Sequence, residues 1–457
     1  MISGRKIYSW AEDLFPICRS LSGNGVRQSL KYLKKILPKL KIKKFTSGSK
    51  VYDWTVPDEW LIKEAYIKNI NGEKVVDFKK NNLHVLGYSS PINKRIKRNH
   101  LLKKLYYLKK KPDAIPYVTS YYKKRWGFCV QFNLIKKLKD KYYFIKIDSA
   151  FKNSKKGGVL NYGELLIKGK SKKEVLISTN ICHPSLANNE LSGVLIATSL
   201  GYWLTKKKLN YSYRILYLPE TIGSISYIKK NLKRLKKNII AGFQVVCVGD
   251  NNRFSYLPSR GEKSLADSAA QEALKSLKVK YKKYSFLERG SDERQYCSPG
   301  VDLPVCSIMR SKYGTYKEYH NSKDNLNFIS PKGLISSHNV YKKAINFIER
   351  KKINLNKHKI NKTKVLKKEN KEKEVIYQRS SKDLCEPFLT KYKLYPSVSF
   401  FSKSNKKNIN DTILNCFAYL DGKTSINEIS KKIKVKKKIL LTIFKMMEKK
   451  GLVKKIL

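Results

Sequence analysis

The sequence predicts an α/β protein with a three-layer, mostly parallel or mixed sheet, a small β-rich inserted domain and a C-terminal winged helix-turn-helix domain. Three observations indicate this fold class. Short apolar runs alternate with amphipathic helical patterns between residues 151 and 350, which is typical of βαβ units. Aromatic and β-branched runs separated by turns fill residues 51–150. Three helical patterns and a short strand end the chain.

The α/β domain is expected to be discontinuous and to comprise residues 1–50 and 151–350. Residues 1–46 space their apolar side chains by three and four on both sides of a turn at residues 22–25, so helices are expected there. Further along, a strand-then-helix order repeats. The expected strands are EVLISTNI, YRILYLPE, GFQVVCVGD and LPVCSIM, and a closing helix is expected near residues 332–350.

The C-terminal part is expected to consist of a charged linker, residues 351–376, and a winged helix domain, residues 377–457. Its helical segments are INDTILNCFAYLDG, SINEISKKI and KKILLTIFKMMEKK. The third segment is strongly apolar and has neither Arg nor Gln, whereas helices that recognise bases usually present such side chains. We therefore expect this domain to contact protein rather than DNA, although its lysines would permit salt-sensitive, non-specific DNA binding.

The chain is strongly basic, with 98 Lys and Arg against 35 Asp and Glu and a formal net charge of +63. Such a charge attracts polyanions. The excess is mostly lysine spread over the whole length, so a lysine-rich solvated surface explains it at least as well as a nucleic-acid function. Hydrophobic residues make up 41% and aromatic residues 11% of the chain, which excludes a disordered protein.

Cysteine usage and hydropathy predict a cytoplasmic protein without membrane insertion. The eight cysteines are scattered and form no CxxC pair, so reduced thiols are expected. The N-terminus lacks the continuous apolar core of a signal peptide, and no stretch of about 18 apolar residues occurs. The sequence leaves open whether the chain forms an oligomer.

Polar residues follow the predicted strands one after another. They are His183, Glu220, Asp250, Asp292 and His320. The carboxyl ends of parallel strands meet at one edge of a sheet, where ligands bind. A hydrolytic zinc site needs about three His or carboxylate ligands, an open position for water and a nearby carboxylate as base. This set offers each part, although Asp250, followed by two asparagines, is better explained as a turn residue.

Several motifs resemble those of the zinc-dependent exopeptidases of the co-catalytic aminopeptidase fold. The motifs are ICHPSLANNELSG, PETIGS, RGSDERQYCSPGVDLP and EYHNSKDN. They are more similar still to a bacterial branch of aminopeptidase-like proteins that has an inserted β domain and a C-terminal winged helix and is often encoded among polysaccharide-biosynthesis genes. The resemblance covers nearly the whole chain, from YDWTVPDEW in the inserted domain to the terminal helices.

The resemblance implies that His183 and His320 are metal ligands. His320 lies in a loop similar to the family's His-Thr-x-x-Asp-Thr segment, and His183 lies after a strand and ahead of a Ser-Gly helix start. Asn189 occupies the position of the family's bridging Asp, and because an amide oxygen is a poor zinc ligand, Glu190 is the expected third ligand. Two alternatives stay open, namely that Asn189 is the third ligand or that Glu190 only stabilises the helix start.

The resemblance also implies that Glu220 is the general base. Thr221 stands where the family has a zinc-binding carboxylate, and residues 246–249 lack the family's next Asp. With these two ligands missing, one zinc ion per chain is expected rather than two. Asp292 and Asp324 are expected to orient the histidines.

The main functional hypothesis is a mononuclear zinc-dependent aminopeptidase-like hydrolase. Its substrate would be an amide at the amino end of a peptide or of an aminoacyl or aminosugar conjugate, with a link to polysaccharide biosynthesis implied by the resemblance. The alternative is a catalytically degenerate, ligand-sensing or regulatory protein whose winged helix binds protein or DNA. Manganese or cobalt would also suit His and carboxylate ligands.

Trp54 and Trp60 are expected in the core of the inserted domain rather than in a substrate pocket.

Overall fold

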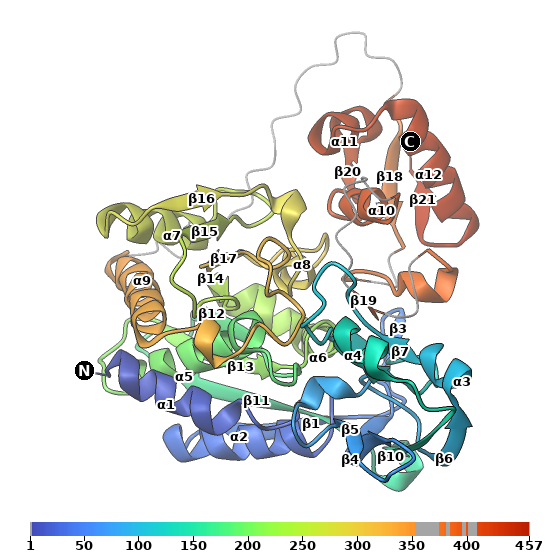
Figure 1. Ribbon diagram of the computed structural model, residues 1–457. Helices are drawn as coiled ribbons and strands as arrows, with labels where there is room; N and C mark the ends of the chain where they lie inside the picture. The colour runs from blue at the N-terminus through green and yellow to red at the C-terminus, as the bar shows by residue number, and fades with distance from the viewer. Residues whose placement is uncertain (1, 352–373, 381–383, 395–398, 401–408, 457) are drawn as a thin grey trace.

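Apolar segments predicted as buried strands form the centre of an eight-stranded mixed sheet (Figure 1). The computed structural model describes residues 2–351, 374–380, 384–394, 399–400 and 409–456. In sheet order the strands are β1 (Lys41–Thr46), β11 (Val159–Ile167), β13 (Ser212–Leu218), β12 (Glu174–Asn180), β14 (Ile239–Gln244), β17 (Val305–Met309), β15 (Phe254–Leu257) and β16 (Tyr281–Lys283). The four strands β13, β12, β14 and β17 run parallel, which confirms the predicted fold class.

Helices cover both faces of this sheet. One face carries α1 (Gly4–Leu14), α2 (Asn24–Ile36), α5 (Ser192–Leu204), α7 (Leu265–Ser276) and α9 (Pro331–Arg350), and the other carries α6 (Ile222–Asn238) and α8 (Glu293–Tyr296) (Figure 1). The strand β12 shows why both faces are buried. Its Val175 and Ile177 join the first core and Leu176 joins the second. Burying such a side chain stabilises the fold by about 1.5–3 kcal/mol.

The prediction that residues 1–46 are all helical is wrong at its end. Residues Lys41–Thr46 form β1, which pairs antiparallel with β11 at the edge of the sheet. Pro38 cannot continue the preceding helix, because it lacks a backbone N–H and clashes with the preceding turn. The segment after it is exposed except for the half-buried Ile42 and Phe45, as suits a strand at the edge of the sheet.

The inserted part is β-rich, as predicted. Its antiparallel sheet consists of β5 (Lys74–Asp77), β4 (Glu59–Lys68), β10 (Tyr142–Lys152) and β6 (Ile92–Lys97). Shorter elements are β2 (Lys50–Val51), β3 (Trp54–Thr55), α3 (Arg98–Leu102), β7 (Leu105–Tyr106), β8 (Val118–Thr119), β9 (Phe128–Cys129) and α4 (Phe132–Lys137). Trp60 is buried in the core that this part shares with the α/β domain, as expected.

The C-terminal unit is a small three-stranded sheet with three helices. Its elements are β18 (Ile376–Arg379), α10 (Ile409–Phe417), β20 (Asp421–Ser425), α11 (Ile426–Ile433), α12 (Lys437–Lys449) and β21 (Val453–Lys455), with the sheet order β20-β18-β21. A capping box between Ser425 and Glu428 begins α11. The unit has its own apolar core. The predicted linker lies almost wholly outside the described residues.

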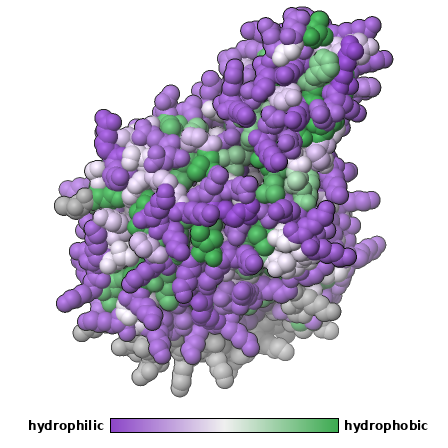
Figure 2. Space-filling model, turned by 90° about the horizontal axis from the view of Figure 1, so that it is seen from below, coloured by the Kyte–Doolittle hydropathy of each residue, from purple (hydrophilic) through white to green (hydrophobic). Residues whose placement is uncertain are grey.

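The hydrophilic surface and the unpaired state of the cysteines agree with what the composition predicts. The face in Figure 2 is covered mostly by hydrophilic residues with scattered hydrophobic ones. All eight cysteines are free thiols, as expected. Within the described part of the chain, each helix is too short or too polar to cross a lipid bilayer.

A buried ion cluster joins three strands of the main sheet. Arg214, on β13, donates to both carboxylate oxygens of Glu174 at 2.6 and 2.8 Å and also donates to Glu164. We predict that Arg214→Met destabilises the protein by about 3–5 kcal/mol, because two carboxylates lose their buried partner. Urea unfolding measures this change. The exposed control Lys208→Met should shift stability by less than about 0.5 kcal/mol, and an equal effect of both variants would contradict the prediction.

The same cluster predicts acid sensitivity. Burial alone would raise the pKa of Glu164, but Lys43, Tyr227 and Arg214 outweigh burial and lower it to about 2. The stability from this lowered pKa is fully present above the ordinary value of 4.5 and is lost as pH falls toward 2. The free energy of unfolding should therefore fall more steeply over this pH range in the wild type than in Glu164→Gln. Parallel pH profiles of the two proteins would refute this.

Candidate active site

His183 lies in the loop that follows β12, at the carboxyl edge of the parallel strands. Its side chain is buried, with 4% of its surface exposed. The Nδ1 atom lies 2.5 Å from Oε2 of Glu190, and the Nε2 atom lies 3.7 Å from Oε2 of Glu220. Since Glu190 accepts from Nδ1, that nitrogen carries the proton, and Nε2 is the nitrogen that can bind a metal.

Glu190 lies in a π-helical turn, Ala187–Leu191, that leads into α5. Its carboxylate is fully buried and accepts the backbone N–H groups of Cys182 at 2.7 Å and His183 at 2.7 and 2.8 Å. The Nε atom of Arg19 lies 3.5 Å from Oε1. Burial would raise the pKa of Glu190, but His183 and Arg19 outweigh burial and lower it. Glu190 is therefore a buried anion that fixes both the loop and the imidazole of His183.

Glu220 follows β13 and faces the same loop. Its side chain is 24% exposed, and its backbone N–H donates to Sγ of Cys182 at 3.2 Å. The next residue, Thr221, has φ 64° and ψ −78°, an unfavourable conformation for a β-branched residue. The Asp292 carboxylate accepts the Thr221 N–H at 2.8 Å, and Arg294 donates to the Thr221 hydroxyl at 2.7 Å. The strained turn that positions Glu220 is therefore held from two sides.

His320 lies in the loop between β17 and α9 and also has a positive φ, 56°. The inserted part holds it in place, because the Tyr117 N–H donates to the His320 carbonyl at 2.9 Å and the Ser322 N–H donates to Ile115 at 2.9 Å. The ring of Tyr319 stacks on the imidazole at 3.9 Å. Burial, followed by the neighbouring His183, lowers the pKa of His320 well below its ordinary value, so this imidazole is neutral and able to bind a metal.

The two imidazoles lie close together, with ring centroids 5.7 Å apart. Tyr117 packs against both, at 5.0 Å from His183 and 5.2 Å from His320. Two imidazoles on one tetrahedral zinc have centroids about 5 Å apart, since each Zn–N bond is about 2.0 Å. The separation of the two imidazole centroids is therefore close to that of two ligands of one zinc ion.

By the resemblance described above, Asn189 and Thr221 stand where the family has zinc-binding carboxylates. In the structure the Sγ atom of Cys247 lies 3.6 Å from the Asn189 carbonyl oxygen. Asp292 and Asp324, expected to orient the histidines, bind backbone instead. Asp324 accepts the N–H groups of residues 188 and 189 at 2.6 and 2.9 Å, and burial raises its pKa to about 7. Both carboxylates thus hold loops of the site.

Cys182, His183 and Glu190 form a buried cluster of metal-binding residue types, with ligand atoms within 4.8 Å of one another. Two ligands of one zinc lie about 3.3 Å apart, whereas the His183 and Glu190 atoms are already bonded at 2.5 Å. Arg19 also opposes a cation there. In this conformation, the open coordination side of the site is therefore Nε2 of His183 and not the interior of the cluster.

A cavity of about 680 Å³ opens onto His183, Glu220 and His320. Its wall combines the α/β domain, the inserted part and the C-terminal unit, and it includes the aromatic residues Trp54, Tyr117, Tyr121, Tyr122 and Phe388 and the charged residues Lys123, Arg294, Glu386 and Lys391. Trp54 is half-buried and packs against the second core, as expected, but it also lines this cavity, which was not expected. This volume is typical of small-molecule sites.

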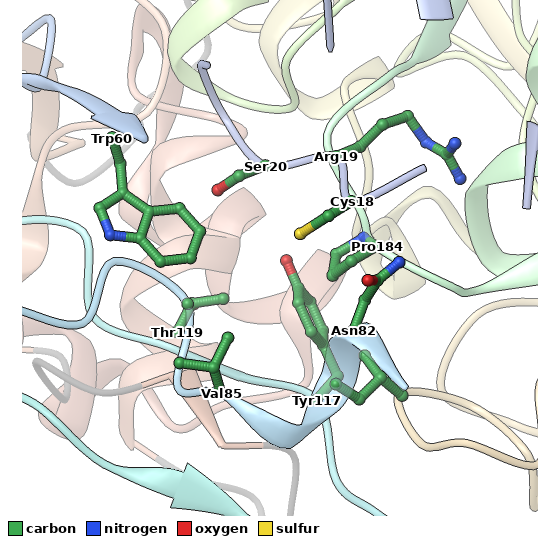
Figure 3. Close-up of a pocket in the computed structure, with 11 residues that line it drawn as sticks. Cys18, Arg19, Ser20, Trp60, Asn82, Val85, Tyr117, Thr119 and Pro184 are labelled. Carbon is green, nitrogen blue, oxygen red and sulfur yellow. The ribbon is translucent and has the colours of Figure 1, made fainter. Parts of the chain in front are cut away.

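A much smaller cavity of about 10 Å³ lies behind Tyr117 (Figure 3). The Tyr117 hydroxyl points toward Cys18 and Ser20 there, and the Arg19 guanidinium points away from it (Figure 3). The Tyr117 hydroxyl also lies 3.1 Å from that of Tyr121. The Tyr117 ring that packs against both imidazoles is thus also held at its hydroxyl end.

Sequence reasoning missed several of these residues. Arg294 lies beside Asp292 in the SDERQY segment, so its closeness to a predicted residue was a usable signal. Arg19 and Tyr117 carry no motif of their own, and Phe388 lies more than sixty residues beyond the last predicted site residue. Asp250 behaves as predicted, since its carboxylate accepts the Asn252 N–H at 2.8 Å in a turn.

Comparisons with known proteins agree with this architecture. Residues 8–351 match the family described as a domain of unknown function, DUF4910, and residues 376–455 match a winged helix-turn-helix family. A candidate polysaccharide biosynthesis protein with an aminopeptidase-like domain from Clostridium acetobutylicum is 44% identical over 354 residues, which are 78% of this chain and 80% of that protein.

Solved structures are similar as well. A candidate peptidase from Clostridium acetobutylicum has a TM-score of 0.73 at 37% identity, covering 99% of this chain and 96% of the other. BSAP, a zinc aminopeptidase from Bacillus subtilis, has a TM-score of 0.56 at 12% identity, covering 77% and 96%, which indicates a shared fold. The chain therefore belongs to the aminopeptidase-like DUF4910 family and carries a C-terminal winged helix-turn-helix unit, as its sequence motifs indicate.

Proposed function

We propose that this protein is an aminopeptidase-like metallohydrolase that binds one zinc ion between His183 and His320 and hydrolyses an amide bond. One observation carries the proposal: two neighbouring imidazoles and one partly exposed carboxylate, Glu220, face the same end of a cavity large enough for a substrate. The zinc aminopeptidase fold and the naming of a relative for polysaccharide biosynthesis support an amide of a peptide or of an aminoacyl or aminosugar conjugate.

Each residue has a defined task in this proposal. Bound zinc would polarise the amide carbonyl and make a water molecule more acidic. Glu220 accepts the proton of the attacking water on its carboxylate and returns it to the leaving amine. Glu190 keeps the proton of His183 on Nδ1, so that Nε2 stays directed toward the cavity. Tyr117 keeps the two imidazoles at their spacing.

Glu190 remains a predicted third ligand, but its contacts favour an orienting role. Its oxygens already accept two backbone N–H groups and the Nδ1 proton of His183, and Arg19 lies beside them. A zinc ion held by only two imidazoles, with water completing its coordination, should bind more weakly than in sites with three protein ligands. Reversible zinc loss on dialysis would fit this arrangement.

A second candidate function is ligand binding without catalysis. Asn189 and Thr221 stand where the zinc aminopeptidases carry carboxylates, and Arg294 is bonded to the Thr221 hydroxyl. A cavity that keeps its shape after losing metal ligands would suit a sensor whose winged helix binds protein or DNA. Metal content and hydrolysis separate the two functions.

We predict about one zinc per chain after zinc is supplied, and loss of zinc in His183→Ala and His320→Ala. Glu190→Gln should weaken zinc binding by about 10- to 100-fold, as expected for a group that orients a ligand. Elemental analysis and competition with a chromogenic chelator give these values. His100→Ala removes an exposed histidine and serves as the matched control. A wild-type protein that remains free of zinc, or a loss of zinc in the control variant alone, would contradict the proposed metal site.

We also predict that Glu220→Gln keeps its zinc but lowers amide hydrolysis by about 10²- to 10⁴-fold, because the variant has no base for the water proton. Aminoacyl p-nitroanilides and N-acylated aminosugars form the substrate panel. Loss of zinc in this variant would instead make Glu220 a ligand. Absence of hydrolysis by a zinc-loaded wild type across the panel would favour the binding function.

A further inference from the structure

The outer wall of the active-site cavity comes from the segment that precedes the helices of the C-terminal unit. Residues 386–391 all line the cavity, together with Leu414 of α10. The ring centroid of Phe388 lies 4.6 Å from Trp54 and 4.5 Å from Tyr122, both of the inserted part. Three aromatic side chains from two distant parts of the chain therefore meet on one wall.

Asp53 fastens this wall to the inserted part. One of its oxygens accepts the Phe388 N–H at 2.8 Å, and the other accepts the Lys391 ammonium and the Tyr392 hydroxyl, each at 2.8 Å. The indole N–H of Trp54 donates to the Glu386 carbonyl at 2.7 Å. The Asp53 side chain is only 3% exposed, whereas that of Lys391 is 55% exposed, so the partly buried bonds to the Phe388 N–H and the Tyr392 hydroxyl are the ones that keep Phe388 in place.

The charges around the wall favour an anion. Glu386 lies between Arg289 at 3.6 Å and Arg294 at 3.4 Å, and Lys391 pairs with Asp53. Lys123 adds a further positive charge to the lining. Of the charged side chains that line the cavity, three are basic, namely Lys123, Arg294 and Lys391, and two are acidic, namely Glu386 at this wall and Glu220 at the reacting end. A free ammonium group is disfavoured at the wall and a carboxylate is favoured.

We propose that Phe388, Trp54 and Tyr122 form a substrate subsite for a carboxylate-bearing group with an apolar face. The aromatic faces would contact the apolar side of the ligand, and the surrounding cations would attract its carboxylate. An acidic sugar and the C-terminal residue of a peptide both have this chemistry. The inference rests on the proposed function for the role of the cavity, and it makes the winged helix unit a contributor to substrate recognition.

Isothermal titration of the full-length protein tests the subsite with three probes, D-glucuronate, N-acetyl-L-phenylalanine and neutral D-glucose. The wild type should bind at least one carboxylate more tightly than glucose, and Phe388→Ala should weaken that binding by about tenfold. Tyr122→Ala should act in the same direction, and since Tyr122 is 38% exposed this variant keeps the fold. Lys123→Gln should weaken carboxylate binding while leaving glucose binding unchanged. Tyr281→Ala, a 40% exposed tyrosine outside the cavity, is the matched control.

Preference for glucuronate would identify an acidic sugar, and preference for N-acetylphenylalanine a peptide-like ligand. Equal binding of carboxylates and glucose, no binding of any probe, or unchanged binding in both Phe388→Ala and Tyr122→Ala would overturn the subsite. Zinc content is measured on the same samples. If the protein binds the probes as expected but contains no zinc, the proposed hydrolase function is contradicted and the subsite stands. If the protein contains zinc but its variants bind the probes as the wild type does, the subsite is contradicted and the hydrolase function stands.

Discussion

The buried contact between Glu190 and His183 is the constraint on which the rest of the site depends. It joins the end of β12 to the start of α5, and Arg19 ties the N-terminal segment to the same carboxylate. A carboxylate without solvent is stable only when charges and N–H groups surround it, and Glu190 has both. The same bonds that make its burial possible therefore fix the tautomer and direction of the imidazole.

The carboxyl edge of the parallel strands explains how residues from separate loops form one site. Parallel strands end together, so His183 and Glu220 reach one cavity although they lie in different βα loops. His320 needs outside support, because the loop that carries it is longer than the loops after β12 and β13. The inserted part supplies that support through Tyr117. It is thus a structural component of the site and not an appendage.

Much of this could be predicted from the sequence, and the misses have physical causes. The central strands followed from their apolar runs, and the two histidines from their place after strands. The role of Glu190 did not follow, because sequence position gives the reach of a side chain and not the partners that surround it, and Arg19 lies far away in the sequence. The place of Trp54 in the cavity wall did not follow either, since that wall is completed by Phe388 from a separate unit.

The location of Phe388 also bears on how this architecture can diversify. A chain that ended at Arg350 would keep both imidazoles and Glu220 but would lose one side of the cavity. The proposed metal site and the Phe388 side of the proposed subsite thus lie in segments that gene truncation or module exchange could separate. Homologues that share the α/β unit but carry a different C-terminal unit are expected to keep the reaction and change what they accept.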